Sequence, residues 1–78
     1  MSKFPSQLRK IRMERGKKQR EMAALLNIKV RSYQAYEGGT REPSIDYLIQ
    51  IADFLQVPLD YLVGRTDEPS PWRKDDLV

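Results

Sequence analysis

Residues 19–39 read QREMAALLNIKVRSYQAYEGG and contain two short apolar patterns with the spacing of a helix. The first pattern starts at Met22 and stops at Asn27, and the second continues through Tyr33 and Tyr36. One long helix would be simpler to form than two short ones. The interruption therefore predicts two helices that are joined by a tight turn and point in different directions.

The turn between these two helices, predicted over 18–26 and about 29–37, has the residues that a sharp change of direction requires. Ala23 is small where the two helices would approach closely. Asn27 stands at the turn, and Asn is among the few residues other than Gly that tolerate a left-handed backbone. Ile28 follows as an apolar anchor into the core. This pattern predicts a helix-turn-helix, in which the second helix enters a DNA major groove.

A further helix is predicted before this pair, in the stretch SQLRKIRMER at 6–15. Leu8 and Ile11 lie there at helical spacing, and Gly16 is a suitable residue to end the helix. After the pair, the two glycines Gly38 and Gly39 stop the second helix, and a loop follows.

An apolar helix is predicted next, in the stretch SIDYLIQIADFLQV at 44–57. Ser44 is a credible N-cap, and Asp46 is placed favourably for the helix dipole. Pro58 breaks this helix and suits the first turn of a short helix over 59–63, which a glycine ends. The buried face of the longer helix is expected to comprise Ile45, Leu48, Ile49, Ala52 and Leu55.

The chain therefore reads as a compact all-α fold of five short helices, because no alternating strand pattern is present. The expected domain covers 5–64, and 65–78 are expected to form a polar, flexible tail. Trp72 is unusual in such a tail. We expect it to be exposed, and the alternative is that it docks on a second subunit or a regulatory partner.

The composition excludes several classes of protein. The 78 residues include no Cys and no His, which removes disulfides, thiolate sites, the usual catalytic triads and nearly all zinc sites. We therefore expect no enzyme activity, metal or cofactor. The acidic pair Asp75-Asp76 is interpreted as solvated surface charge and not as an acid–base pair. No apolar run reaches the ~18 residues of a membrane span, and the stretch MSKFPSQLRK at 1–10 lacks the apolar h-region of a signal peptide. These features predict a soluble, cytoplasmic protein without a membrane partner.

The net charge of +3 conceals an asymmetry between the two halves of the chain. Residues 1–41 carry eleven Lys or Arg against three Asp or Glu, a balance of +8. Residues 42–78 carry three against eight, a balance of −5. The N-terminal half is thus suited to face a polyanion, although a solvated charged surface would give the same composition.

The helical wheel of the second helix of the pair separates two kinds of face. Val30, Arg31, Gln34 and Ala35 fall on the side opposite the two tyrosines, which are predicted to face the core. Arg can pair with guanine and Gln with adenine, and small apolar groups can touch a thymine methyl. This outward face is suited to reading base edges.

The stretch from Leu8 to Gly64 resembles the lambda-repressor-like (Cro/Xre-type) helix-turn-helix family. The residues that carry the resemblance are LRKIR at 8–12, Gln19, Ala23, Tyr36-Glu37 before a glycine, Pro43-Ser44, and VPLDYLVG at 57–64.

The resemblance implies a role for individual positions. Val30, Arg31 and Ala35 match positions that reach base edges, and Gln34 matches one that contacts bases or backbone. Arg12 and Glu37 match a structural ion pair that holds the fold. The resemblance also implies contacts to the DNA backbone from Gln19, Lys29, Ser32, Thr40 and Arg41. The positive charges of Lys18 and Arg20 predict further backbone contacts.

The resulting hypothesis is a regulator that binds double-stranded DNA as a homodimer on an inverted-repeat operator and represses transcription. Leu59 and Leu62 are expected in the core, whereas Tyr61 and Val63 are candidates for the dimer interface. The alternative is an antitoxin-like or adaptor module, in which the tail or the last helix binds a protein partner.

Overall fold

The computed structural model describes residues 3–66, and this part of the chain contains five helices and no strand. The expected all-α fold is confirmed. Most of the predicted tail, including Trp72, lies outside the described residues. The helices are α1 (Phe4–Glu14), α2 (Gln19–Leu26), α3 (Val30–Gly38), α4 (Ile45–Leu55) and α5 (Leu59–Leu62). Within these residues, no helix combines the length and the apolar character needed to cross a membrane.

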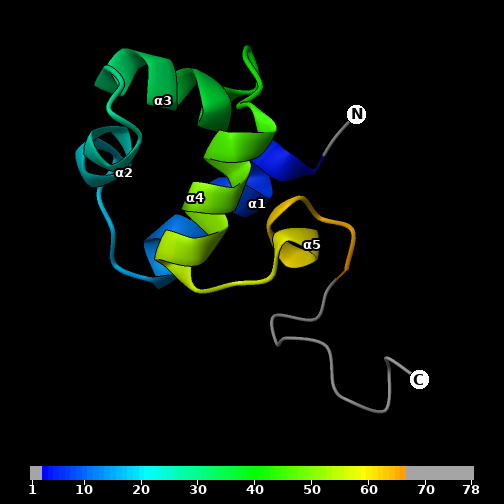
Figure 1. Cartoon of the computed structure of the whole chain (residues 1–78). Coiled ribbons are helices and arrows are strands. Elements are labelled where there is room, and N and C mark those ends of the chain that lie inside the picture. The colour runs from blue at the N-terminus through cyan, green and yellow to red at the C-terminus, as the bar shows by residue number, and fades with distance from the viewer. Residues whose placement is uncertain (1–2, 67–78) are drawn as a thin grey trace.

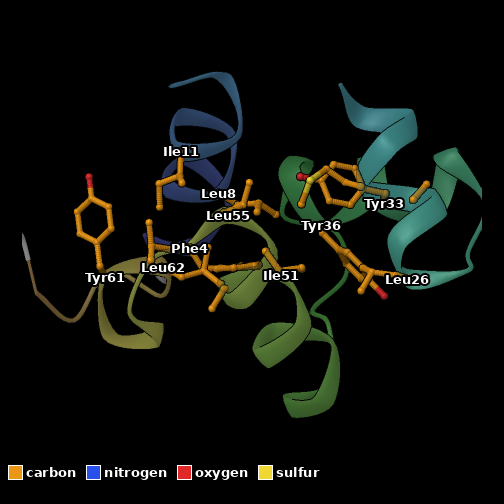
Figure 2. Packing of buried hydrophobic residues seen from close by; sticks show 14 residues of the cluster. Phe4, Leu8, Ile11, Leu26, Tyr33, Tyr36, Ile51, Leu55, Tyr61 and Leu62 are labelled. Carbon is orange, nitrogen blue, oxygen red and sulfur yellow. The ribbon is translucent and has the colours of Figure 1, made fainter. Parts of the chain in front are cut away.

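The five helices surround one apolar core. Figure 1 shows α3 along the top of the molecule with α2 beneath it, α4 through the centre, and α5 at the lower right. α3 packs against α1 and α2, while α5 packs against α1 and α4. α5 is thus held on the part of the molecule that lies away from α3, which Figure 2 also shows by the separation of Tyr61 from Tyr33.

The buried residues come from all five helices and form a single cluster (Figure 2). Leu8 and Ile11 of α1 are 0% and 1% exposed, as their spacing predicted. α1 begins at Phe4, two residues before the expected stretch, and Phe4 is itself buried in the core. Pro5 lies in the first turn of α1, where its missing N–H leaves no intrahelical bond unmade.

The predicted buried face of α4 is wrong at one edge. Ile45 and Ile49 are 67% and 45% exposed, whereas Ile51 is fully buried. α4 carries apolar residues around most of its circumference, so the helical period alone does not define which of them face inward. Contact with α2 and α5 rotates the buried side toward Ile51 and Leu55.

The short helix α5 also departs from expectation. Leu62 is fully buried as predicted, but Leu59 is 37% exposed. The side of α5 that faces the core lies between Tyr61 and Leu62. Leu59 is more than a quarter-turn around the helix from that side. Tyr61 is 8% exposed, and its hydroxyl points away from the cluster in Figure 2. Val63 is partly buried. Tyr61 therefore offers little surface to a second subunit, and the interface role of both residues stays a prediction.

Local interactions end and begin the helices as the sequence indicated in several places. Asn27 adopts the left-handed conformation, with φ 55° and ψ 46°, directly after α2. Gly16 has a φ of 68° just beyond α1. The hydroxyl of Ser44 accepts a hydrogen bond from the Tyr47 amide at 3.2 Å and so caps α4.

One side chain of α1 and that of its C-cap residue, Arg15, donate to carbonyls at the ends of later helices. Arg15 Nε donates to the Leu55 carbonyl at 2.7 Å, at the end of α4. Gln7 Nε2 donates to the Tyr61 carbonyl at 3.0 Å, in α5. The carbonyls in the last turn of a helix lack an intrahelical partner, and here the Tyr61 carbonyl also accepts from the Gly64 amide at 3.1 Å. The two side-chain bonds join the α1 segment to the ends of α4 and α5.

A second residue other than glycine adopts the left-handed conformation, and the sequence did not indicate it. Gln56, which follows α4, has φ 59° and ψ 48°. This conformation costs an L-residue with a side chain about 1–2 kcal/mol relative to the right-handed one. Glycine lacks that cost but loses more backbone entropy on folding.

We expect Gln56→Gly to raise the free energy of unfolding by about 0.5–1 kcal/mol, because it relieves the left-handed strain. The matched control is Gln50→Gly in the interior of α4, where Gly should lower the free energy of unfolding by about 1 kcal/mol. Urea unfolding followed by circular dichroism measures both. A change of the same sign in the two variants would contradict the conformational argument.

Candidate nucleic-acid interface

α3 separates its residues into an anchored face and an exposed face. Tyr33 and Tyr36 are 0% and 5% exposed, and their rings meet edge to face with centroids 6.2 Å apart. Val30, Arg31 and Gln34 are exposed on the other side. The predicted orientation of α3 is therefore confirmed, and the two tyrosines fix it by packing against the core. Ala35 lies beside this exposed face and is partly buried, as is Ser32.

The loop after α3 is held against the end of that helix. The amides of Thr40 and Arg41 donate to the carbonyl of Ala35 at 3.1 and 3.3 Å. Gly39, which directly precedes Thr40, has a φ of 81°, a left-handed conformation that lets the chain fold back. The exposed side chains of Thr40 and Arg41 consequently lie next to the C-terminal end of α3.

A carboxylate joins α3 to the two helices behind it. Glu37 accepts hydrogen bonds from Arg12 Nε at 2.6 Å and from Arg12 Nη2 at 3.2 Å. It also accepts from the Tyr33 hydroxyl at 2.5 Å and from Gln19 Nε2 at 3.1 Å. The side chains of Arg12 and Glu37 are 11% and 5% exposed, so the ion pair that the resemblance implied is present and largely buried.

The pKa values of this cluster reflect its hydrogen bonds. Burial on its own would raise the pKa of Glu37, but the hydrogen bonds from Arg12, Tyr33 and Gln19 outweigh it and lower that pKa. Burial and the adjacent carboxylate raise the pKa of Tyr33. The hydrogen bond to Glu37 raises the pKa of Arg12. Glu37 and Arg12 are therefore both charged, and Tyr33 is neutral, at neutral pH.

The cluster extends from the interior to the exposed face of α3. Gln34 Nε2 donates to Gln19 Oε1 at 3.1 Å, and Gln19 in turn donates to Glu37. Gln19 is the first residue of α2, where the sequence placed a contact to a DNA phosphate. The sequence placed Gln19 and Gln34 in the same surface but gave no sign that they bind each other.

The cations predicted to contact the DNA backbone remain available. Lys18, Arg20, Lys29 and Arg41 are exposed, and none of them forms an ion pair within residues 3–66. Other cations of the basic half have a partner inside the protein. Arg15 caps α4, and the Lys17 ammonium lies 5.0 Å from the centroid of the Phe54 ring.

The sequence placed Arg9 among the cations of the basic half but assigned it no individual contact. A surface hollow at the junction of α1, α2 and α3 is lined by Arg9, Arg12, Gln19, Gln34, Glu37 and Gly38. Arg9 is exposed, so it places a positive charge at the rim of this hollow beside Gln19 and Gln34. The LRKIR pattern contains Arg9, but its neighbourhood follows only from how α1 crosses the other two helices. No cluster of potential metal ligands occurs among the described residues.

Comparison with other proteins identifies the class to which this fold and surface belong. The Helix-turn-helix family model matches residues 8–62. The chain therefore belongs to the Cro/Xre-type helix-turn-helix family, as the resemblance indicated.

Particular relatives support the same assignment. The uncharacterized HTH-type transcriptional regulator YqaE of Bacillus subtilis is 42% identical over 83% of this chain and 57% of its own length. The cryptic phage CTXphi transcriptional repressor RstR of Vibrio cholerae is 34% identical over 82% of this chain and 58% of its own length. The chain thus spans less than two-thirds of the length of these relatives.

A solved structure has the same fold. The crystal structure of a transcriptional regulator from Listeria innocua matches 99% of this chain and 70% of its own, with 31% identity and a TM-score of 0.78.

The lowered pKa of Glu37 predicts a loss of stability in acid. A carboxyl with a pKa lowered by folding contributes its full stabilisation above 4.5, its ordinary value, and loses it as the pH falls through the folded pKa. We expect Glu37→Gln to lower the free energy of unfolding at pH 7 by about 3 kcal/mol, since it leaves Arg12 without its countercharge. Urea unfolding between pH 7 and pH 3 measures both effects.

The difference in stability between the native protein and Glu37→Gln should shrink as the pH falls below 4.5. Asp53→Asn is the control, because Asp53 is an exposed acid on α4. A constant difference across this pH range would mean that the ionised carboxylate of Glu37 does not stabilise the fold.

Proposed function

We propose that the protein binds double-stranded DNA sequence-specifically through α3 and acts as a transcriptional regulator. The observation that carries this proposal is the exposed face of α3, anchored from behind by two buried tyrosines and flanked by cations without an internal partner. Membership of the helix-turn-helix family supports it. The regulator acts in the cytoplasm, where it needs no cofactor or metal.

The exposed face of α3 supplies the base contacts in this proposal. Arg31 pairs with a guanine edge, and Gln34 bonds an adenine. Val30, which is 39% exposed, and Ala35, which is partly buried at the edge of this face, touch thymine methyl groups. These contacts select the sequence because the major groove presents a different pattern for each base pair.

The residues around α3 position the domain on the sugar-phosphate backbone. Each phosphate that a cation neutralises releases counterions and adds about −0.9 to the slope of log K against log salt. Such contacts raise the affinity for every duplex and carry no sequence information. The residues that we assign to the backbone are Lys18, Gln19, Arg20, Lys29, Ser32, Thr40 and Arg41.

The regulator works as a homodimer on an inverted repeat. A single module of this kind buries roughly 600–1,000 Å² of protein surface on DNA, and a second copy doubles that area on a two-fold site. α5 lies away from α3, so an interface at α5 leaves α3 of both subunits free for DNA (Figure 1). At this end of the molecule, a larger fraction of Val63 than of Tyr61 is exposed for such a contact. The similarity to a phage transcriptional repressor supports repression as the outcome.

Selection from random double-stranded DNA tests the proposal. The purified full chain is incubated with the library near physiological salt, and bound duplexes are sequenced. An enriched inverted repeat with half-sites about one helical turn apart is expected for a two-fold dimer. Weak, salt-sensitive binding without enrichment would sink the proposal and favour the alternative, a module that binds a protein partner through α5 or the tail.

Two substitutions separate base contacts from backbone contacts. Arg31→Ala should reduce the discrimination between the selected site and a site altered at one base pair by ~1–3 kcal/mol. Lys29→Ala should weaken all duplexes about equally and reduce the salt slope by about 1. Fluorescence anisotropy at several salt concentrations measures both quantities.

Lys10→Ala is the control for these variants, because Lys10 is an exposed cation of α1 that we do not assign to the DNA. Equal loss of affinity for every duplex in Arg31→Ala would remove Arg31 from the base-reading role.

A further inference from the structure

Glu37, Gln19 and Gln34 form a chain of hydrogen bonds, here called the amide relay, that leads from the buried ion pair to the exposed face of α3. An ionised carboxylate can only accept hydrogen bonds. Gln19 must therefore turn its amino group, and not its carbonyl oxygen, toward Glu37. The distance from Gln19 Nε2 to Glu37 Oε1 is 3.1 Å.

The orientation of Gln19 then fixes the orientation of Gln34. With its amino group on Glu37, Gln19 presents its carbonyl oxygen to α3, and this oxygen accepts from Gln34 Nε2 at 3.1 Å. If Gln34 turned over, two carbonyl oxygens would face each other. All donors in the amide relay thus point the same way, from Gln34 through Gln19 to Glu37.

The carboxylate that begins the relay is itself held in one position and one charge state. Arg12 binds it through two nitrogens, and the Tyr33 hydroxyl binds it from within α3. Its side chain is 5% exposed, so water competes little for these bonds. Reversal of the relay would lose the charge-assisted hydrogen bond from Gln19 to Glu37, which is stronger than a bond between neutral groups.

A fixed orientation determines what Gln34 presents to a ligand. An amide has two N–H donors and one carbonyl oxygen, and the relay uses one of the donors. The carbonyl oxygen and the second N–H of Gln34 remain, and within residues 3–66 neither has a partner. The adenine edge offers an N6 amino donor and an N7 acceptor, which match this pair. The guanine edge offers two acceptors and leaves the carbonyl oxygen of Gln34 facing another oxygen.

We propose that Glu37 and Gln19 are positioning residues, which fix the polarity of the Gln34 amide and make the protein select adenine over guanine at the base pair that Gln34 faces. This inference rests on the proposed DNA-binding function and deepens it. Without the relay, the Gln34 amide can turn over about its terminal bond and accommodate either purine.

The experiment uses the full chain and duplexes carrying the selected site. Gln34→Ala first locates the base pair that Gln34 reads, because the preference among the four bases should disappear at that position alone. The native protein should prefer adenine over guanine there by about tenfold or more. Gln19→Met then removes the relay while keeping a side chain of similar length and helix propensity at the start of α2.

Gln19→Met should reduce the preference for adenine over guanine at the located position to about threefold or less, with preferences elsewhere in the site unchanged. Gln19 is also assigned a phosphate contact. Gln19→Met should therefore also lower the affinity for every duplex by a similar factor. Lys18→Met is the matched control, since it removes a neighbouring backbone contact without touching the relay. Thermal unfolding of each variant checks that the fold is retained.

Each outcome either supports or overturns the relay. A uniform loss of affinity in Gln19→Met, with the purine preference intact, would show that Gln19 only contacts the backbone. A guanine preference in the native protein at the located position would overturn the polarity argument without any variant, even if Gln19→Met fails to fold. Unchanged preferences in Gln34→Ala at every position would overturn it as well. The absence of any selected site would instead contradict the proposed function itself.

Discussion

A buried negative charge must be neutralised and fully hydrogen-bonded, and the arrangement of this small domain depends on meeting that requirement for Glu37. Its donors come from three helices: Arg12 from α1, Gln19 from α2, and Tyr33 from α3 itself. Each of these helices is short and marginal on its own. The carboxylate therefore fixes their relative positions at a point where apolar packing, which has no direction, would allow sliding.

The same cluster connects the stability of the fold to the surface that we propose for DNA. Tyr33 both fills the core and donates to Glu37, so the turn of α3 about its axis is fixed by shape and by a hydrogen bond. The arginines fall into two groups, one bound within the protein and one exposed. Arg12 and Arg15 bind acceptors within the protein, whereas Arg31 and Arg41 have no ion-pair partner among residues 3–66 and remain for a polyanion.

The helices are arranged so that recognition and assembly use different parts of the molecule. α2 and α3 form one end, and α5 is held on the other side by α1 and α4 (Figure 1). α1 and its C-cap contribute polar side chains in both directions, with Arg12 toward α3, and Gln7 and the C-cap Arg15 toward the ends of α5 and α4. This segment thereby joins the proposed DNA-reading end to the proposed dimer end.

The sequence by itself determined the five helices, the left-handed turn at Asn27 and the inward face of the two tyrosines, because helical period and turn chemistry are local properties. It also indicated the exposed face of α3. Only the tertiary structure decided that Ile51 and not Ile49 is buried, that Leu59 is exposed, and that Arg9 lies beside Gln19. The hydrogen bond between Gln19 and Gln34 was likewise decided only by the tertiary structure. These features depend on how helices distant in sequence cross one another, and no local pattern encodes that geometry.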